Sequence, residues 1–231
     1  MIKLSPRLKL IYDMVPACDT VADVGCDHGY LFLSLLENGV AKKAIAMDVN
    51  KGPLELAKKN ASEAGLISNV QFRLSNGFAA LTPGEADVIC LCGMGGVLMQ
   101  RILDAGKTVA KEATCLVVEP QSEYRQFREF ISKEHFCIID EELCTEENKI
   151  YPIMKIKYDP SFKEEYSDLE LEYGPIILKK RPELFARLLD KNYNEYSKIL
   201  SRLEKGEKSS QICERIRELK DLLSLVEQAR N

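Results

Sequence analysis

Glycines and a carboxylate near the amino end of the chain have the types and spacing of a nucleotide-binding turn. Residues 21–33 read as a short buried strand, a turn containing Gly25 and Gly29, and an apolar run that begins a helix. A strand that enters a helix through glycines leaves backbone N–H groups free to bind a nucleotide. A dinucleotide site follows the pattern G-x-G-x-x-G, but Asp27 stands where its second glycine would be. A carboxylate there would repel a pyrophosphate, and it suits a ligand with a cationic end, such as S-adenosylmethionine.

Two further polar residues have positions typical of nucleoside recognition. Asp48 ends an expected strand over 43–48, about twenty residues after the glycine turn, where an acid commonly binds ribose hydroxyls. Asp48 also precedes a predicted helix over 53–64, so helix capping is the alternative role. Asn76 follows an expected strand over 70–74, where it could hold an adenine edge or simply form a turn.

A second glycine cluster, Gly93-Met94-Gly95-Gly96, follows an apolar strand expected over 86–92 and precedes a predicted helix over 97–103. In a doubly wound sheet the carboxyl ends of strands one and four border the ligand crevice. Bare backbone at this point would let a methyl donor and its acceptor meet, although turn conformation alone would also favour glycine. The candidate cofactor-binding residues are therefore Asp23, Gly25, Cys26, Asp27, His28, Gly29, Asp48, Val49, Asn76, Gly77, Gly93, Met94 and Gly95.

Composition limits the class of protein. The chain has 231 residues, a formal net charge of −4 and no run of about 18 apolar residues, so we expect no membrane span. The first residues lack the apolar core of a signal peptide. Eight cysteines form no C-x-x-C pair, and with only His28 and His135 we expect no metal site and a reduced, cytoplasmic setting. Because the whole chain is acidic, nucleic-acid binding would depend on local basic patches.

The order of expected elements indicates an α/β fold. Strands and helices alternate up to about residue 135, which predicts a parallel, doubly wound sheet. Residues 136–143 and 151–158 read as an antiparallel pair at its end. A lead-in helix is expected over 1–18, and its Arg7 belongs either to a solvated face or to an RNA-facing rim. We place a Rossmann-like domain at 1–160 and a helical, coiled-coil-like domain at 161–231.

The carboxyl-terminal segment is predicted to be an antiparallel helical hairpin. Its helices are expected over 182–205 and 209–229, joined by a turn over 205–210. Apolar residues such as Leu184 and Leu188 form one stripe. Basic residues on the first helix could contact phosphates, remain merely solvated, or belong to a structural brace. The candidate substrate-binding residues are Arg7, Lys179, Lys180, Arg187 and Lys191.

Taken together, these motifs resemble a known family, the bacterial tRNA (adenine-N1)-methyltransferases that modify adenosine 22. The matching stretches are 23–31, 46–50 with 53–54, 93–96, 147–151 and 173–175. The chain departs from the family pattern at Phe32, where proline is expected, at Asn76, where an acid is frequent, and at Glu119, where glutamine is usual. The resemblance implies a class I methyltransferase fold, S-adenosylmethionine as methyl donor and tRNA as substrate. We expect a monomer without metal.

Methylation at adenine N1 sets modest chemical demands. The chain has Cys92-Gly93-Met94-Gly95 where amino-methyltransferases carry an N/D-P-P-Y/F motif, which speaks against methylation at N6. The N1 lone pair is free at neutral pH, so positioning and a carboxylate that favours the cationic product would suffice. The catalytic candidates are Asp27, with His28 and Tyr30 shaping or stacking on the base. Asp27 could instead bind only the methionine ammonium group, and Tyr30 could belong to the core.

Two other functions remain possible from the residues alone. A small-molecule methyltransferase would use the same donor site, and a non-catalytic RNA-binding protein could keep the same fold. A small-molecule methyltransferase would be expected to cover its pocket with a lid, whereas this chain adds a basic helical segment. A non-catalytic RNA-binding protein would bind the donor without transferring its methyl group.

Overall fold

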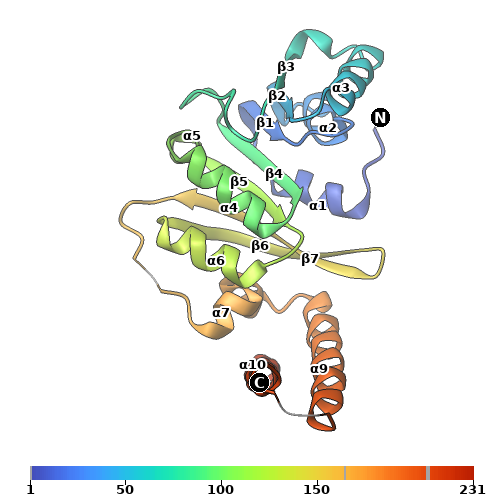
Figure 1. Ribbon diagram of the computed structural model, residues 1–231. Coiled ribbons are helices and arrows are strands. Elements are labelled where there is room, and N and C mark those ends of the chain that lie inside the picture. The colour runs from blue at the N-terminus through green and yellow to red at the C-terminus, as the bar shows by residue number, and fades with distance from the viewer. Residues whose placement is uncertain (1, 164, 207–208) are drawn as a thin grey trace. The chain divides into compact units, whose positions relative to one another are not determined.

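The computed structural model describes residues 2–163, 165–206 and 209–231. By its internal contacts the chain divides into two compact units, Met1–Glu165 and Tyr166–Asn231. The first unit carries the sheet, and the described part of the second is helical (Figure 1). No helix in these ranges is long and apolar enough to cross a membrane.

A seven-stranded mixed sheet organises the first unit, in the order β3-β2-β1-β4-β5-β7-β6. The first five strands pair in parallel, β7 is antiparallel to β5, and β6 is antiparallel to β7. The predicted parallel sheet with a terminal hairpin is therefore confirmed. The strands are β1 (Cys18–Val24), β2 (Ala41–Asp48), β3 (Val70–Leu74), β4 (Val88–Met94), β5 (Cys115–Pro120), β6 (Phe136–Glu146) and β7 (Lys149–Tyr158).

The strand order determines where the helices lie. The chain moves outward from β1 to β3, returns to β4 beside β1, and then moves outward the other way. Because parallel crossovers are right-handed, the helices before and after this reversal cover opposite faces of the sheet. The crevice of such a fold opens between β1 and β4, at their carboxyl ends. The helices of this unit are α1 (Pro6–Met14), α2 (Tyr30–Glu37), α3 (Lys51–Glu63), the short 3-10 helix η1 (Ile67–Asn69), α4 (Gly96–Ala105), α5 (Lys107–Glu112) and α6 (Tyr124–Lys133).

The two central strands are buried on both faces. Val21, Ala22, Cys90 and Leu91 are completely inaccessible to solvent, and removing such side chains from water stabilises the fold by about 1.5–3 kcal/mol for each large aliphatic residue. Against this apolar background some polar side chains are also buried. Those at or just after the carboxyl ends of strands are Asp23, Asp48, Ser75 and Glu119. Buried polar groups need compensating partners, so their concentration along one edge indicates a site there.

The first helix is shorter than predicted. We expected it over 1–18, but α1 spans Pro6–Met14, and the residue that follows it, Val15, has an extended backbone. Pro16 explains this end, because its ring disfavours helical conformation in the preceding residue. At the other end the Ser5 side chain accepts a hydrogen bond from the Leu8 N–H, and Pro6 occupies the first helical position.

The second unit contains α7 (Asp168–Tyr173), α8 (Pro175–Lys180), α9 (Glu183–Glu204) and α10 (Ser210–Arg230). Ion pairs show that α9 and α10 run antiparallel: Arg230 near the end of α10 bonds Asp190 near the start of α9 at 2.6 Å, and Lys220 bonds Glu204 at 3.2 Å. The predicted hairpin is confirmed. Of its predicted turn, residues 207 and 208 lie outside the described residues.

The buried stripe of α9 lies one position from the predicted one. Phe185 and Leu189 are buried, whereas Leu184 and Leu188 are only half-buried. Phe185 packs edge-on against the Tyr173 ring, with ring centroids 5.6 Å apart. Contact with α7 therefore rotates the buried face of α9 away from the predicted leucine stripe.

Candidate functional site

The turn after β1 is tied to the end of the neighbouring strand. The N–H groups of Gly25 and Cys26 both donate to the Met47 carbonyl, at 2.8 and 2.9 Å. Gly25 and Gly29 have φ values of +77° and +80°, which side chains rarely tolerate. A Cβ on Gly29 would also lie 2.6 Å from the buried Phe32 ring. Glycine is therefore required here for both backbone conformation and close packing.

A cleft of about 280 Å³ opens beside this turn at the carboxyl edge of the sheet. Its walls come from α1, the turn after β1, the start of α2, the end of β4 and the segment after β5. It therefore lies at the expected crevice between β1 and β4. The lining residues are Arg7, Leu8, Asp23, Gly25, Cys26, Asp27, His28, Tyr30, Leu31, Cys92, Gly93 and Gln121.

Asp23 supplies a buried acid to this cleft. It is 5% exposed, and burial raises the pKa of its carboxyl to about 7. A hydrogen bond from the Phe32 backbone opposes this shift, and the charges of Asp48 and Asp27 add to it. Burial also raises the pKa of the Cys26 thiol, so this side chain lines the cleft as a neutral group. A cation entering the cleft would stabilise the ionised form of Asp23.

The three catalytic candidates lie together. Asp27 is exposed and has a φ of +48°, and its Oδ2 lies 3.5 Å from His28 Nε2. The rings of His28 and Tyr30 are 5.7 Å apart and tilted by 34°. The Asn60 side chain donates to the His28 carbonyl at 2.9 Å, which anchors the loop to α3. The buried His28 Nδ1 has no hydrogen-bond partner among the described residues. Tyr30 is 43% exposed, so it lines the cleft and does not belong to the core.

The remaining cofactor candidates lie at the ends of β2 and β3. Asp48 is buried, and its Oδ1 accepts the Asn50 N–H at 2.8 Å, while Val49 is 60% exposed. Asn76 is exposed and lines a separate hollow of about 570 Å³ beside α4. Gly77 has a φ of +57°, and a Cβ there would lie 2.8 Å from Ile102. These residues border the same edge of the sheet without lining the smaller cleft.

The second glycine cluster has two structural roles. Gly93 lines the cleft, and its φ of +77° accompanies a register shift between β4 and β5. Gly95 and Gly96 pack instead against the segment after β5, where a Cβ on Gly96 would lie 2.6 Å from the Ser122 carbonyl oxygen. Met94 ends β4, and a Cβ on Gly25 would clash with its side-chain Cε. Gly93 is therefore the member of this cluster that presents bare backbone to a ligand.

Sequence reasoning identified Arg7 but missed the residues that hold it. Arg7 Nη1 donates to Glu119 Oε2 at 3.0 Å, and Arg7 Nε donates to Glu146 Oε2 at 2.8 Å. Glu119 lies near the carboxyl end of the otherwise apolar strand β5, at the same edge of the sheet as Asp23 and Asp48. A polar residue at the end of an apolar strand is the pattern that indicated Asp48, and the same pattern could have identified Glu119. No comparable sequence pattern would have identified Glu146, or Gln121, which follows β5.

The other predicted substrate-binding residues lie in the second unit. All are exposed, at the end of α8 and along the first half of α9: Lys179, Lys180, Arg187 and Lys191. The candidates thus divide between a cleft residue of the first unit and four exposed basic residues of the second.

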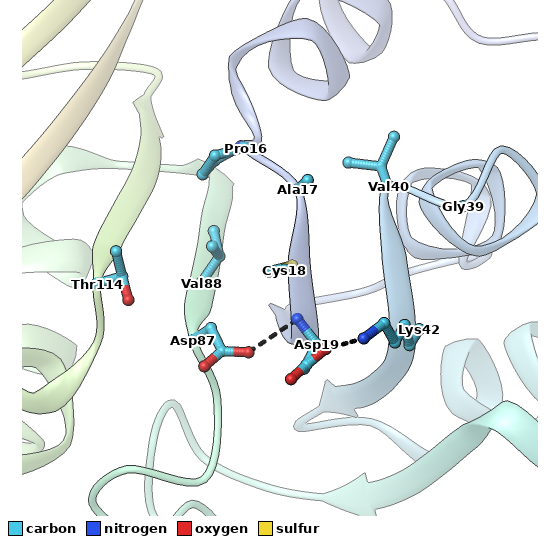
Figure 2. A pocket seen from close by; sticks show the side chains of 10 residues that line it. All are labelled: Pro16, Ala17, Cys18, Asp19, Gly39, Val40, Lys42, Asp87, Val88 and Thr114. Carbon is cyan, nitrogen blue, oxygen red and sulfur yellow. Dashed lines mark hydrogen bonds and ion pairs between the residues drawn. The ribbon is translucent and has the colours of Figure 1, made fainter.

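Another hollow, of about 490 Å³, lies at the opposite edge of the sheet (Figure 2). Its polar groups bond one another: Asp87 Oδ2 accepts the N–H groups of Asp19 and Thr20, and Lys42 pairs with Asp19 at 2.6 Å. It lies at the amino ends of β1 and β2, away from the glycine turns. We therefore place the functional site in the smaller cleft.

The fold and the cleft define a class of protein. The strand order 3-2-1-4-5-7-6, the glycine turn after β1 and the acid at the end of β2 are those of a class I S-adenosylmethionine-dependent methyltransferase. The family model described as tRNA (adenine(22)-N(1))-methyltransferase matches residues 21–228. The chain belongs to this family.

Individual relatives are similar along their whole length. The tRNA (adenine(22)-N(1))-methyltransferase of Bacillus subtilis is 28% identical over 230 residues, covering 98% of this chain and 97% of the relative. The crystal structure of the B. subtilis m1A22 tRNA methyltransferase superposes with a TM-score of 0.90 at 27% identity, covering 100% of both chains. A Streptococcus pneumoniae protein in complex with S-adenosyl-L-methionine has a TM-score of 0.83 at 28% identity and covers 99% of this chain and 100% of its own.

Proposed function

We propose that this protein transfers a methyl group from S-adenosylmethionine to N1 of adenosine 22 in the core of tRNA, in the cytoplasm and as a monomer. The observation that carries the proposal is the cleft at the carboxyl edge of β1 and β4, where buried and exposed carboxyls meet the bare backbone of Gly93. Membership of the family and the S-adenosylmethionine bound to the S. pneumoniae relative support the same donor and reaction.

The residues of the cleft fit a donor that is cationic at one end. Asp23 and Asp27 offer carboxyls beside the turn of Gly25 and Gly29, which suits the ammonium and sulfonium groups. Asp48 and Asn76 border the same edge of the sheet outside this cleft, and we assign Asp48 to the ribose and Asn76 to the adenine edge of the donor. When bound, S-adenosylmethionine supplies the electrophilic methyl group.

The chain's own residues then have to place the acceptor base. Attack by N1 needs no general base, so the protein contributes alignment and charge. The Asp27 carboxylate favours the positive charge that the adenine acquires, or accepts its exocyclic N–H. His28 and Tyr30 form an adjacent aromatic pair on which the base can stack. Gly93 allows the base to approach the backbone closely.

The substrate is too large for the cleft alone. Adenosine 22 must leave its stack to reach the cleft, as bases do in other enzymes that modify them. Recognition of the tRNA by shape would then need a second surface. We assign this role to the exposed Lys179, Lys180, Arg187 and Lys191.

Nucleoside mass spectrometry of unmodified tRNA incubated with protein and donor tests the proposal. We expect 1-methyladenosine, and no product from a transcript in which position 22 is guanosine. N6-methyladenosine, or label transferred to small metabolites but not to tRNA, would contradict it. Donor binding without any transfer would instead favour the non-catalytic alternative.

A further inference from the structure

Glu119 is a fully buried carboxyl that contacts two residues lining the cleft, Gly93 and Arg7. Its side chain is 0% exposed, and its Oε2 accepts both the Gly93 N–H, at 2.7 Å, and Arg7 Nη1, at 3.0 Å. Its Oε1 is buried without a hydrogen-bond partner in the described parts of the chain. Burying a carboxyl costs free energy unless the group is paired. The two hydrogen bonds to Oε2 therefore have to compensate for the burial of Glu119.

The contact with Gly93 compensates for an irregularity in the sheet. Strands β4 and β5 pair Cys92 with Glu119 and Met94 with Pro120, so Gly93 is an extra residue in β4. Such a bulge leaves the extra residue outside the ladder. The Glu119 carboxylate on the neighbouring strand accepts the freed N–H. The backbone that faces the cleft at Gly93 is thereby fixed in its left-handed conformation.

The contact with Arg7 fixes a side chain that comes from a different part of the chain. Arg7 lies in α1, and its guanidinium is bonded through Nη1 to Glu119 and through Nε to Glu146 at 2.8 Å. A planar guanidinium held at two nitrogens cannot rotate about its own axis. Its Nη2 has no hydrogen-bond partner among the described residues, and Arg7 lines the cleft. We call Arg7, Glu119 and Glu146 the arginine clamp.

The charges of the clamp indicate what it presents to a ligand. Burial raises the pKa of the Glu119 carboxyl, and the charge of Arg7 and the hydrogen bonds from Gly93 and Arg7 oppose this shift. With both carboxyls ionised, two negative charges surround one positive charge. The clamp then offers directed N–H groups without net positive charge, which suits a neutral acceptor atom better than a phosphate.

We propose that Glu119 is a positioning residue for the methyl acceptor: through Gly93 and Arg7 it holds the wall of the cleft on which adenine is placed, with Arg7 Nη2 donating to the base. This inference rests on the proposed function. Glu119 itself does not touch the substrate. It acts by holding a backbone segment and a guanidinium that do.

Steady-state kinetics of the Glu119→Leu variant test this role, with Glu119→Gln as the conservative variant. Leucine has a similar volume but accepts neither bond, whereas a glutamine oxygen can accept both the Gly93 N–H and Arg7 Nη1, as Glu119 Oε2 does. At saturating donor we expect kcat for tRNA to fall about 10- to 100-fold in Glu119→Leu, the range for one hydrogen bond to a charged group, and to stay within about threefold of wild type in Glu119→Gln. The affinity of both variants for the donor, measured by calorimetry, should stay within about twofold of wild type, because Glu119 acts on the acceptor side of the cleft.

Combination with Arg7→Lys distinguishes positioning from a direct role. Lysine keeps the positive charge but cannot bond two carboxylates through separate nitrogens of a rigid plane. In this background Glu119→Leu should lower kcat by less than about threefold, because the effects of residues in contact are not additive. The matched control is Glu129→Gln, which removes a carboxyl that pairs with Lys133 on α6 outside the cleft, and we expect wild-type kinetics.

Three outcomes would overturn the inference while the wild-type protein still methylates adenosine 22. They are losses of kcat that multiply in the double variant, a lowered melting temperature of Glu119→Leu with unchanged kcat, and loss of donor binding by Glu119→Leu. The second outcome would mean that the carboxyl only supports the fold, and the third that it supports the donor site. If the wild-type protein itself formed no 1-methyladenosine, the proposed function would fail first.

Discussion

Asp23 and Asp48 lie at the carboxyl ends of adjacent parallel strands, and the charge of Asp48 opposes the ionisation of Asp23. Burial is the main cause that raises the pKa of Asp23 to about 7, and the charge of Asp48 adds to it. Two acids so placed are suited to a ligand that brings its own positive charge. This relationship makes the pH dependence of the protein a direct test of the site.

The ligand-free protein should lose stability as the pH rises towards neutrality. The folded state keeps a proton on Asp23 up to about pH 7, whereas the unfolded chain releases it near pH 4. Because the folded state binds more protons in this window, the free energy of unfolding falls as pH rises from about 4 to above 7. Denaturant titrations of wild type and Asp23→Asn at several pH values measure this, and parallel curves would contradict it.

Donor binding should show the opposite trend. A cationic donor favours ionised Asp23, so binding expels a proton below about pH 7 and tightens as pH rises through this range. Calorimetry in buffers of different ionisation enthalpy measures the proton release. In Asp23→Asn the release should disappear. Equal release by both proteins would exclude Asp23 as its source.

Replacing Asp27 separates its two possible roles. Its φ of +48° is tolerated by asparagine, so Asp27→Asn should keep the turn intact. If the carboxylate favours the cationic base, the rate at saturating donor falls by about 2–3 kcal/mol of barrier. If it binds only the ammonium group, donor affinity falls and the saturated rate stays near wild type. We expect the first result, and the second would remove Asp27 from the catalytic residues.

Two glycines with similar backbones provide a matched pair for testing the turn. Gly29 and Gly39 have φ values of +80° and +69°, but a Cβ on Gly39 would meet no atom within 4 Å. Gly39→Ala should therefore cost only the backbone penalty of about 1–2 kcal/mol. Gly29→Ala adds a clash with the buried Phe32 ring, which should cost about 1–3 kcal/mol more and weaken donor binding. Equal unfolding free energies would show that the turn tolerates a side chain.

The four exposed basic residues assigned to tRNA in the second unit should control tRNA binding and its salt dependence. Each phosphate contact contributes roughly 0.7–0.9 logarithmic units of affinity per tenfold change in salt. Replacing Lys179, Lys180, Arg187 and Lys191 by glutamine should weaken tRNA binding and flatten this slope, and donor binding should not change. The apolar contacts of α9 and α10 are untouched by these changes, so the second unit should stay folded.

Replacing a second pair of lysines elsewhere in the chain provides a control for that experiment. Lys42 and Lys43 are exposed on β2, and Lys42 lines the hollow at the opposite edge of the sheet. Replacing this pair by glutamine removes the same charge as replacing Lys179 and Lys180. The salt slope should change only for Lys179 and Lys180. An identical effect of both pairs would mean that tRNA responds to net charge alone.

Most residues on the donor side of the site could be predicted from the sequence, because they lie close to one another along the chain. Gly25, Asp27 and Gly29 are close in sequence, and Asp48 follows at the end of the next strand, so strand and turn rules locate them. The sheet and the helical hairpin follow from alternation and periodicity. The end of α1 was predicted too late, because the effect of Pro16 on Val15 was overlooked.

The residues on the acceptor side of the site could not be predicted in the same way. Glu119 and Glu146 are brought to Arg7 by pairing of β5, β7 and β6, and such pairing leaves no periodic signal between the residues. The buried stripe of α9 was misplaced by one residue because Tyr173, outside the helix, determines which face is covered. Local patterns thus predicted elements, and contacts between distant segments determined the details.

The span between Arg7 and Glu146 also affects the order in which the enzyme is completed during synthesis. These residues are separated by 139 positions, so the ribosome must make β6 before the guanidinium can be held. The glycine turn and β2 emerge far earlier and need only short loops to close. A nascent chain could therefore assemble its donor-binding turn long before the wall for the acceptor exists, and methyl transfer becomes possible only once the sheet is nearly complete.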